Sequence, residues 1–220
     1  MEPIGPKLAE GRDSEIFEHG PGRVLRRTFV PRSLEHEAAV MRHVRAHGYP
    51  VPQVHDVGEG WLVMDRVDGP TMLDVATRPP FRMRRWALVL ADLHRRLHDI
   101  PAPDGLPEAG LPGDRVVHLD LHPLNVLLGA DGPVVVDWAN ARRGDPALDV
   151  ADVWVTLLCA EIPATGFERR AAELGKRLFL RWFLRAAGRE AALRALPAAR
   201  PRTVRNGSAE PRAVARRPPT

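Results

Sequence analysis

A group of polar side chains stands among apolar residues between positions 116 and 138. His118, Asp120, His122 and Asn125 follow one another at short intervals, and Asp137 comes twelve residues after Asn125. Most of the surrounding residues are valine and leucine, which favour burial. An unpaired carboxylate in such surroundings costs several kcal/mol, so each aspartate should face a cation, hydrogen-bond donors or a cleft.

Phosphoryl transfer gives one chemical reason for this set of residues. The attacking hydroxyl needs a carboxylate that orients it and accepts its proton, while a triphosphate needs Mg2+ held by hard oxygen ligands. An aspartate, an asparagine five residues later and a second aspartate at the end of a strand supply these groups. The pattern therefore indicates a nucleotide-dependent phosphotransferase.

The same segment resembles the aminoglycoside phosphotransferase family. Residues 118–125 read His-Leu-Asp-Leu-His-Pro-Leu-Asn and are followed by Asp137-Trp138, whereas the family pattern is close to His-Gly-Asp-Leu-His-Pro-Gly-Asn followed by Ile-Asp-Trp. The resemblance extends over about residues 10–190. It implies a two-lobed, protein-kinase-like fold, ATP or another nucleoside triphosphate as donor, Mg2+ as cofactor and a small-molecule hydroxyl as acceptor.

The resemblance also implies roles for the residues of the loop. Asp120 is expected to be the catalytic base, and His122 is expected to lie beside the transferred phosphate or the substrate hydroxyl. Asn125 and Asp137 are expected to hold Mg2+. His118 is expected to pack and to hydrogen-bond within the loop.

Further positions match the family's nucleotide site and its supports. Arg26 takes the place of the lysine that grips the α- and β-phosphates, and Glu37 that of its helix partner. Adenine is expected to lie against the backbone from Asp65 to Val67, and Ser14 ends the phosphate-covering loop.

In the segment 144–151, Asp149 is expected to brace the catalytic loop. Leu119 and Leu124 stand where the family has glycines.

Two alternatives to a phosphotransferase remain. Arginine is not geometrically equivalent to lysine, so Arg26 and the two loop leucines also suit a weak or inactive nucleotide-binding pseudokinase. A metal-dependent hydrolase is the other alternative, because alternation along a strand would put His118, Asp120 and His122 on one face. Pro123, however, breaks such a strand, and a hydrolase leaves Asn125 and Asp137 unexplained.

The spacing of apolar residues separates a strand-rich part from a helix-rich part. It changes from a period of two to about 3.6 near residue 68. The expected strands cover residues 15–18, 23–26, 53–57 and 61–67, with one helix, capped by Ser33, in their midst. The expected helices cover residues 82–100, 146–160 and 167–187, with a loop over 101–115 and a strand-loop-strand block over 116–137.

These elements predict an α+β fold. A small antiparallel β lobe with one helix, which would bind the nucleotide, occupies residues 1–67. A mostly helical lobe with the catalytic loop and metal site occupies residues 68–196.

The net charge of +4 originates in the C-terminal segment. Residues 197–220 contain six arginines and one glutamate, a net charge of +5, which leaves about −1 for residues 1–196. This segment has almost no large apolar residues, so we expect a basic, disordered tail. Because the basic charge is confined to this tail, composition argues against a nucleic-acid-binding protein.

Composition also bears on location and partners. No apolar run approaches the roughly 20 residues of a membrane span, and residues 1–10 lack the regions of a signal peptide, so we expect a cytoplasmic protein. The single cysteine, Cys159, excludes an internal disulfide framework and is expected to be buried. The pattern implies no obligate protein partner.

The acidic residues bear on the acceptor. Polycationic acceptors such as aminoglycosides need an acidic pocket. Glu161, Glu168 and Glu173 are too few and too mixed with arginine to predict one.

Overall fold

The computed structural model describes residues 4–11, 13–76, 80–160 and 165–206. The chain forms two compact units, one ending at Val67 and the other beginning at Asp68. Each unit has its own sheet or sheets and its own buried residues. None of the described helices is long and apolar enough to cross a membrane.

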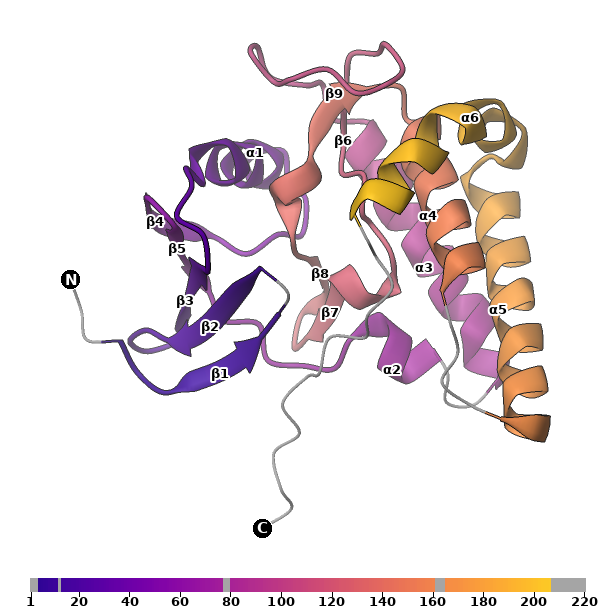
Figure 1. Cartoon of the computed structure of the whole chain (residues 1–220), viewed down its shortest axis with the longest axis horizontal. Coiled ribbons are helices and arrows are strands. Elements are labelled where there is room, and N and C mark those ends of the chain that lie inside the picture. The colour runs from indigo at the N-terminus through magenta and orange to yellow at the C-terminus, as the bar shows by residue number, and fades with distance from the viewer. Residues whose placement is uncertain (1–3, 12, 77–79, 161–164, 207–220) are drawn as a thin grey trace. The chain divides into compact units, whose positions relative to one another are not determined.

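The first unit is a five-stranded antiparallel sheet with one helix (Figure 1). Its strands, in the sheet order β1-β2-β3-β5-β4, are β1 (Lys7–Glu10), β2 (Ser14–Glu18), β3 (Arg23–Thr28), β5 (Trp61–Asp65) and β4 (Val54–Gly58). Gly20 and Gly22 have φ values of 68° and 69°, which allow the tight turn between β2 and β3. The predicted hairpin is therefore confirmed.

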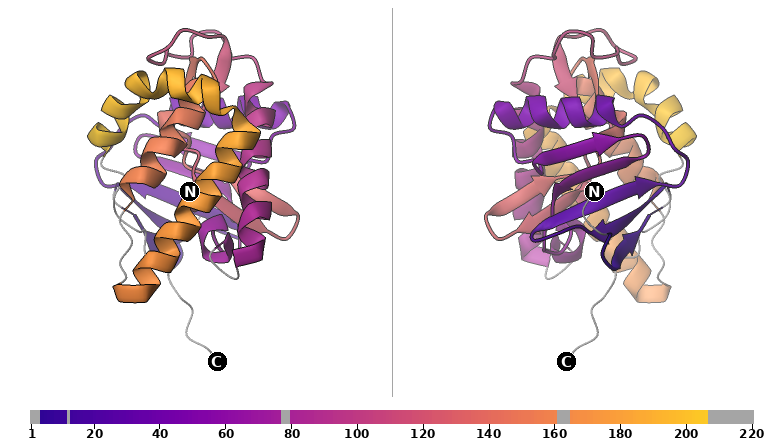
Figure 2. Two further views of the ribbon diagram at one scale, coloured as in Figure 1. Left: turned by 90° about the vertical axis from the view of Figure 1, so that its right-hand side faces the viewer. Right: turned by 90° about the vertical axis from the view of Figure 1, so that its left-hand side faces the viewer.

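Helix α1 (Glu35–Ala46) buries the predicted stripe of apolar residues, including Ala38, Met41 and Val44. The residue at its N-cap is Leu34, not the predicted Ser33. The Ser33 hydroxyl still accepts a hydrogen bond from the backbone N–H of Glu35, at 3.3 Å. Figure 2 shows this helix along the sheet of the first unit.

The second unit is mainly helical and includes two small antiparallel sheets of two strands each. Its helices are α2 (Met72–Ala76), α3 (Pro80–His98), α4 (Ala147–Cys159), α5 (Gly166–Ala187) and α6 (Arg189–Asn206), with 3-10 turns η1 (Pro123–Asn125) and η2 (Trp138–Asn140). Its strands are β6 (Arg115–Val117) paired with β9 (Arg142–Gly144), and β7 (Val126–Gly129) paired with β8 (Gly132–Val135). The observed elements confirm the predicted α+β class, a sheet with one helix followed by helices.

The prediction of a disordered tail from residue 197 is wrong over its first part, because α6 continues to Asn206. The reason is a stripe of small residues: Ala192, Ala195 and Ala199 recur on one face and are buried. Alanine favours helix, and the stripe allows close packing. Residues 207–220 lie outside the described residues.

The expectation that Cys159 is buried is also wrong. Cys159 is the last residue of α4 and is exposed. Strand β1 and helices α2 and α6 were not predicted, because each is short or is disguised by charged residues and prolines.

Candidate active site

The loop after β6 holds the carboxylate of Asp120 through two side chains. One oxygen, Oδ1, lies 3.1 Å from His122 Nε2. The other, Oδ2, accepts a hydrogen bond from Asn125 Nδ2 at 3.1 Å, and the same nitrogen donates to the Asp120 carbonyl at 2.8 Å. The side chains of Asp120 and His122 remain 20% and 13% exposed, so a fixed carboxylate still reaches solvent.

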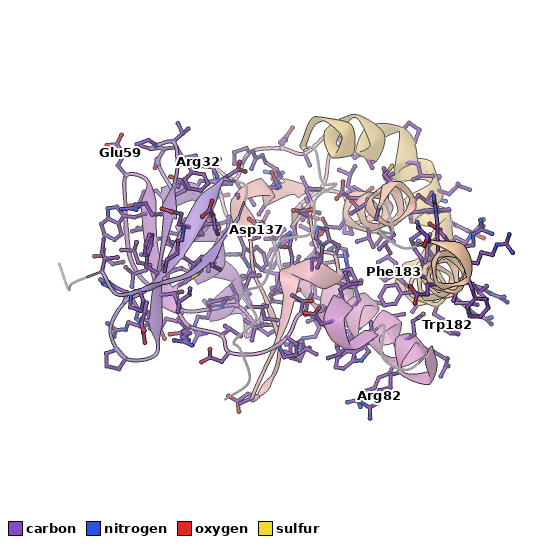
Figure 3. All side chains as sticks on the ribbon, turned by 60° about the horizontal axis from the view of Figure 1, so that its bottom comes forward. Arg32, Glu59, Arg82, Asp137, Trp182 and Phe183 are labelled. Atoms are coloured by element: carbon purple, nitrogen blue, oxygen red, sulfur yellow. The ribbon has the colours of Figure 1, made fainter. Side chains whose placement is uncertain are left out.

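The hairpin β7–β8 brings Asn125 and Asp137 to one place. Val126 pairs with Val135, and the backbone N–H of Val136 donates to the Asn125 carbonyl at 3.0 Å. Asp137 is the next residue, and its left-handed φ of 69° turns the chain into η2 (Figure 3). Because Asn125 Nδ2 is directed at Asp120, its Oδ1 is the atom that could meet a cation.

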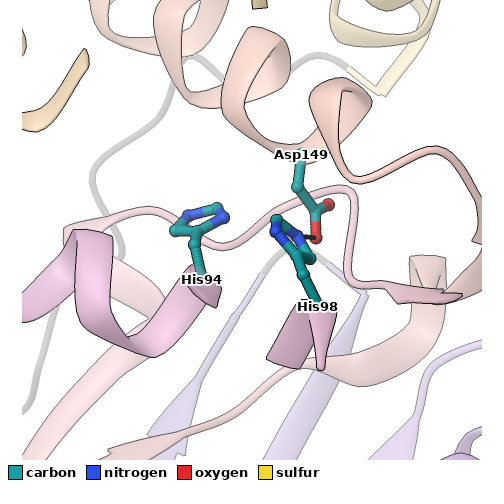
Figure 4. A group of neighbouring side chains, drawn as sticks. All are labelled: His94, His98 and Asp149. Atoms are coloured by element: carbon teal, nitrogen blue, oxygen red, sulfur yellow. Dashed lines mark hydrogen bonds and ion pairs between the residues drawn. The ribbon is translucent and has the colours of Figure 1, made fainter. Parts of the chain in front are cut away.

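The carboxylate of Asp149, which belongs to α4, braces the loop that carries Asp120. Its Oδ2 accepts from the backbone N–H of His118 at 2.9 Å, and its Oδ1 accepts from that of Leu119 at 2.5 Å. His98 Nε2 lies 3.0 Å from the same Oδ2 (Figure 4). Burial opposes ionisation of Asp149, but the hydrogen bond from His98 and the electrostatic interaction with that imidazole lower the pKa of Asp149 to about 2. The predicted bracing contact is confirmed.

Leu119 has an unusual backbone that this brace supports. Its φ of 62° lies in the left-handed region, where a non-glycine residue costs about 1–2 kcal/mol. This is one of the two positions where the family has glycine. The other, Leu124, lies in η1, and it is not among the described non-glycine residues with positive φ. The hydrogen bond from Leu119 N–H to Asp149 therefore helps to hold a strained residue just before Asp120.

A second buried histidine supports the loop from α3. His94 Nε2 lies 3.0 Å from the carbonyl of Leu121, so this nitrogen must carry the proton. Its ring also makes an edge contact with Phe183 at 5.2 Å, and Nδ1 has no hydrogen-bond partner among the described residues. Burial lowers the pKa of His94 to about 3, so the neutral form is the native one.

The lowered pKa of His94 predicts a loss of stability on mild acidification. The folded state holds His94 neutral, while the unfolded state takes up a proton as the pH falls below 6.5. Stability contributed by this group is full above pH 6.5 and falls as the pH drops toward 3. By pH 5 the loss is about 2 kcal/mol. Denaturant unfolding between pH 7 and pH 5 measures it.

In that experiment, His94→Leu should flatten the pH dependence. The matched control is His47→Gln, because His47 is exposed on the surface of the first unit. A slope unchanged in His94→Leu would show that another group titrates.

His118 is buried against Trp138, with ring centroids 4.6 Å apart. Its backbone N–H is bonded to Asp149, but neither ring nitrogen has a hydrogen-bond partner among the described residues. Burial lowers the pKa of this imidazole. The expected packing is therefore observed, but the expected hydrogen bond within the loop is not found among the described residues, because the backbone N–H of His118 donates to Asp149 of α4.

The structure does not assemble the metal site of the hydrolase alternative. The described residues do not bring His118, Asp120 and His122 together as metal ligands. The alternation that suggested one face fails because β6 ends at Val117 and Leu119 turns the chain.

The ligand-capable atoms of His94, His98 and Asp149 do lie within 4.8 Å of one another. The hydrogen bonds described above already account for this grouping.

In the first unit, Arg26 of β3 and Glu37 of α1 form a buried ion pair between Nη2 and Oε2. Ser14 lies opposite Thr28 at one end of β3, and Asp65 lies opposite Arg23 at the other.

The Asp65 carboxylate accepts from Gln53 N–H at 3.0 Å and contacts His55 Nε2 at 2.7 Å. The Asp65 N–H donates to the Gln53 carbonyl. Val67 makes no hydrogen bond within the described chain.

Sequence reasoning did not identify His94 and His98. The available signal was their spacing of four residues, which places both on one face of α3 together with the predicted apolar stripe. A histidine pair on a buried face requires hydrogen-bond partners, and Asp149 and the Leu121 carbonyl supply them.

Comparisons with known proteins identify sequences and structures to which this chain is similar. A streptomycin 6-kinase of Streptomyces griseus is 30% identical, over 53% of this chain and 48% of the relative. The chain thus spans about half the length of the curated relative it matches.

Two solved structures share the fold. Aminoglycoside phosphotransferase APH(4)-Ia has a TM-score of 0.57 at 18% identity, over 93% of this chain and 94% of the other. The gentamicin complex of APH(2")-IIa has a TM-score of 0.65 at 16% identity, over 94% of this chain and 83% of the other. These structures confirm the two-lobed, protein-kinase-like fold.

A family model extends the agreement along the sequence. The model for the phosphotransferase enzyme family matches residues 7–115 and 106–191, which include both the Arg26–Glu37 pair and the Asp120 loop. Because these matches cover most of the chain, the chain belongs to the phosphotransferase enzyme family.

Proposed function

We propose that this protein transfers the γ-phosphoryl group of ATP to a hydroxyl of a small molecule with the help of Mg2+. The observation that carries the proposal is that hydrogen bonds link the local segments that carry Asp120, Asn125 and Asp137. Asn125 donates to Asp120 through its side chain and accepts from Val136, the neighbour of Asp137, through its carbonyl. These contacts link the proposed base, Asp120, to the segments that carry the two proposed oxygen ligands of Mg2+, Asn125 and Asp137.

Asp120 is the proposed base. Its carboxylate accepts the proton of the acceptor hydroxyl while that oxygen forms a bond to the γ-phosphorus. The bond between the γ-phosphorus and the bridging oxygen breaks, and ADP leaves with the electron pair. Contacts from His122 and Asn125 fix the carboxylate, and each of its oxygens still has room for a further hydrogen bond.

Asn125 and Asp137 fit Mg2+ by the chemistry of their donors. An amide oxygen and a carboxylate are the hard ligands that this ion prefers, and Asp137 is partly exposed where an ion could enter. Bound there, Mg2+ would neutralise charge on the β- and γ-phosphates. The protein's part is to fix the two side chains through the β7–β8 hairpin.

Asp137→Ala should remove the dependence of nucleotide binding on Mg2+. The expected result is that wild-type protein binds ATP more tightly with Mg2+ than with EDTA, whereas the variant binds equally in both. Isothermal titration measures the two affinities. Asp131→Ala, an exposed position in the β7–β8 turn, is the matched control. A Mg2+ effect that survives in Asp137→Ala would count against the assigned ligand.

Arg26 is the proposed phosphate-binding cation of the first unit. Its side chain is only 10% exposed and is held by Glu37, much as the family's lysine is held by its helix partner. A guanidinium binds phosphate through a planar fork and not as a point charge, so its position relative to the phosphates should differ from that of lysine.

The acceptor is proposed to be a small molecule with a free hydroxyl. The similar proteins include a streptomycin 6-kinase and a structure in complex with gentamicin, and both compounds are aminoglycosides. Of the acidic residues considered for such a polycation, Glu173 is paired with Lys176 at 3.1 Å, Glu168 is exposed on α5, and Glu161 lies outside the described residues. An acceptor with less positive charge fits these residues better.

A screen for ATP consumption tests the function and the acceptor together. The panel contains streptomycin, amino alcohols, neutral sugars and nucleosides, each with Mg-ATP, and ADP release is measured. We expect ADP release with at least one acceptor, and release that is lower by about 10²-fold or more from Asp120→Asn protein. Release that is equal in both proteins would overturn the assignment of Asp120 as the base.

A nucleotide-binding pseudokinase is the second candidate. The specific observation that favours it is Leu119, whose strained backbone directly precedes Asp120. Binding of ATP without ADP release for any acceptor would support this candidate over the enzyme.

A further inference from the structure

A basic groove lies where the end of helix α5 meets the start of helix α6 in the second unit, and Figure 2 shows the two helices meeting there at an angle. Its volume is about 840 Å³. The lining contains five arginines and a single glutamate, and none of the residues proposed for phosphotransfer. The arginines are Arg177, Arg181 and Arg185 of α5 and Arg189 and Arg194 of α6. The expectation that basic charge is confined to residues 197–220 is therefore wrong, because a net charge near zero over residues 1–196 conceals this local cluster.

All five arginines are exposed, and no described residue forms an ion pair or a hydrogen bond with their guanidinium groups. Arg189 lies over the ring of Trp154, with its Cζ 5.6 Å from the ring centroid. Five like charges around one groove repel one another and raise the local positive potential. Such a surface is complementary to an anionic ligand.

The spacing of the arginines indicates an extended ligand. Arg177, Arg181 and Arg185 follow at intervals of four residues, so they lie on one face of α5 and span about 12 Å. Two more arginines continue along α6. A compact anion could meet only part of this series, whereas a chain with repeated negative charges could meet all of it.

The floor of the groove favours a peptide over a nucleic acid. Leu180 and Leu184 lie beneath the arginines and are 8% and 4% exposed. Single-stranded nucleic acids need successive aromatic side chains for stacking, and here Trp154 already lies under Arg189. In an extended peptide, side chains on one face repeat about every 7 Å, close to the roughly 6 Å between arginines on successive turns of α5.

We propose that the groove binds an extended, acidic and partly apolar peptide segment of a protein partner. The acidic side chains pair with the arginines, and the apolar ones face Leu180 and Leu184. The chain's own residues 207–220 are not complementary, because they carry three arginines and one glutamate.

Fluorescence anisotropy with the full chain tests the proposal. The probe is a fluorescein-labelled, 12-residue peptide of alternating Glu and Leu, compared with the same peptide containing Lys in place of Glu and with labelled 12-nucleotide oligo(dT). The groove variant is Arg181→Glu with Arg185→Glu. The matched control is Arg169→Glu with Arg170→Glu, two exposed arginines of α5 outside the groove.

The expected result is binding of the Glu-Leu peptide alone, weakened about tenfold or more in the groove variant and unchanged in the control. All substitutions are at exposed positions, and circular dichroism verifies that both variants are folded. An equal loss of peptide affinity in both variants would show that binding depends on the overall charge of the protein and not on the groove, and would overturn the proposal. So would absence of peptide binding, tighter binding of oligo(dT), or a dimer in size-exclusion chromatography that the groove variant disrupts.

Discussion

Asp120→Asn is expected to lower phosphotransfer turnover by about 10²–10⁴-fold, the usual contribution of a general base. Asparagine keeps the shape of the side chain and one oxygen toward Asn125 Nδ2, but it cannot take the proton of the acceptor hydroxyl. The affinity for Mg-ATP should stay within about twofold, because the proposed metal ligands and Arg26 are untouched.

Coupled measurement of ADP release gives the turnover number, and isothermal titration gives the ATP affinity. Asp131→Asn is the control, since this aspartate is exposed in the turn between β7 and β8. Full turnover in Asp120→Asn would show that another group, with His122 the nearest candidate, accepts the proton. A large loss of ATP affinity would instead place Asp120 among the nucleotide ligands.

The parts of the site that could be predicted from sequence are those encoded by short spacings. One loop and one hairpin carry Asp120, Asn125 and Asp137. Because these elements are short and continuous in sequence, residues that are near one another in the sequence are also near one another in space. The β2–β3 hairpin was predictable for the same reason, because its glycines determine the turn locally.

Features that depend on contacts between distant segments were harder to predict. His98 and Asp149 are hydrogen-bond partners, but they are 51 residues apart in the sequence. The residues around His98 therefore do not indicate that Asp149 is its partner. The sequence resemblance placed Asp149 at the loop, but the partner histidine required the packing of α3 against the loop and α4.

Helix α6 was missed for a different reason. Its prolines and arginines resemble a disordered segment in composition, while a stripe of three buried alanines carries the packing. Small residues contribute little to a hydrophobicity pattern, so the helix becomes evident only beside its neighbour α4.

Asp149→Asn is expected to destabilise the protein by about 2–4 kcal/mol. Asp149 is fully buried and accepts hydrogen bonds from His118 N–H, Leu119 N–H and His98. An asparagine retains one acceptor oxygen and presents an NH2 group to donors that need an acceptor. The two backbone groups cannot both be satisfied, and the strained Leu119 loses its support.

The lowered pKa gives this prediction a pH dependence with a definite sign. The ionised carboxylate is the native form, so its contribution is present above the ordinary aspartate value of 3.8 and is lost as the pH falls toward about 2. The free energy of unfolding of wild-type protein, measured in urea, should therefore decrease by this contribution between pH 4 and pH 2. The free energy of unfolding of Asp149→Asn protein should not show this decrease.

Activity provides the test that separates support of the loop from general stability. Folded Asp149→Asn protein, assayed below its midpoint temperature of unfolding, should have a lower kcat than wild-type protein with little change in KM for ATP. The reason is that Asp120 follows Leu119 directly, whereas Arg26 lies in the other unit. A double-mutant cycle with His98→Ala should give a coupling energy of about 1 kcal/mol or more. Additive effects would mean that His98 and Asp149 act separately, and an unchanged kcat would show that the loop holds its position without the brace.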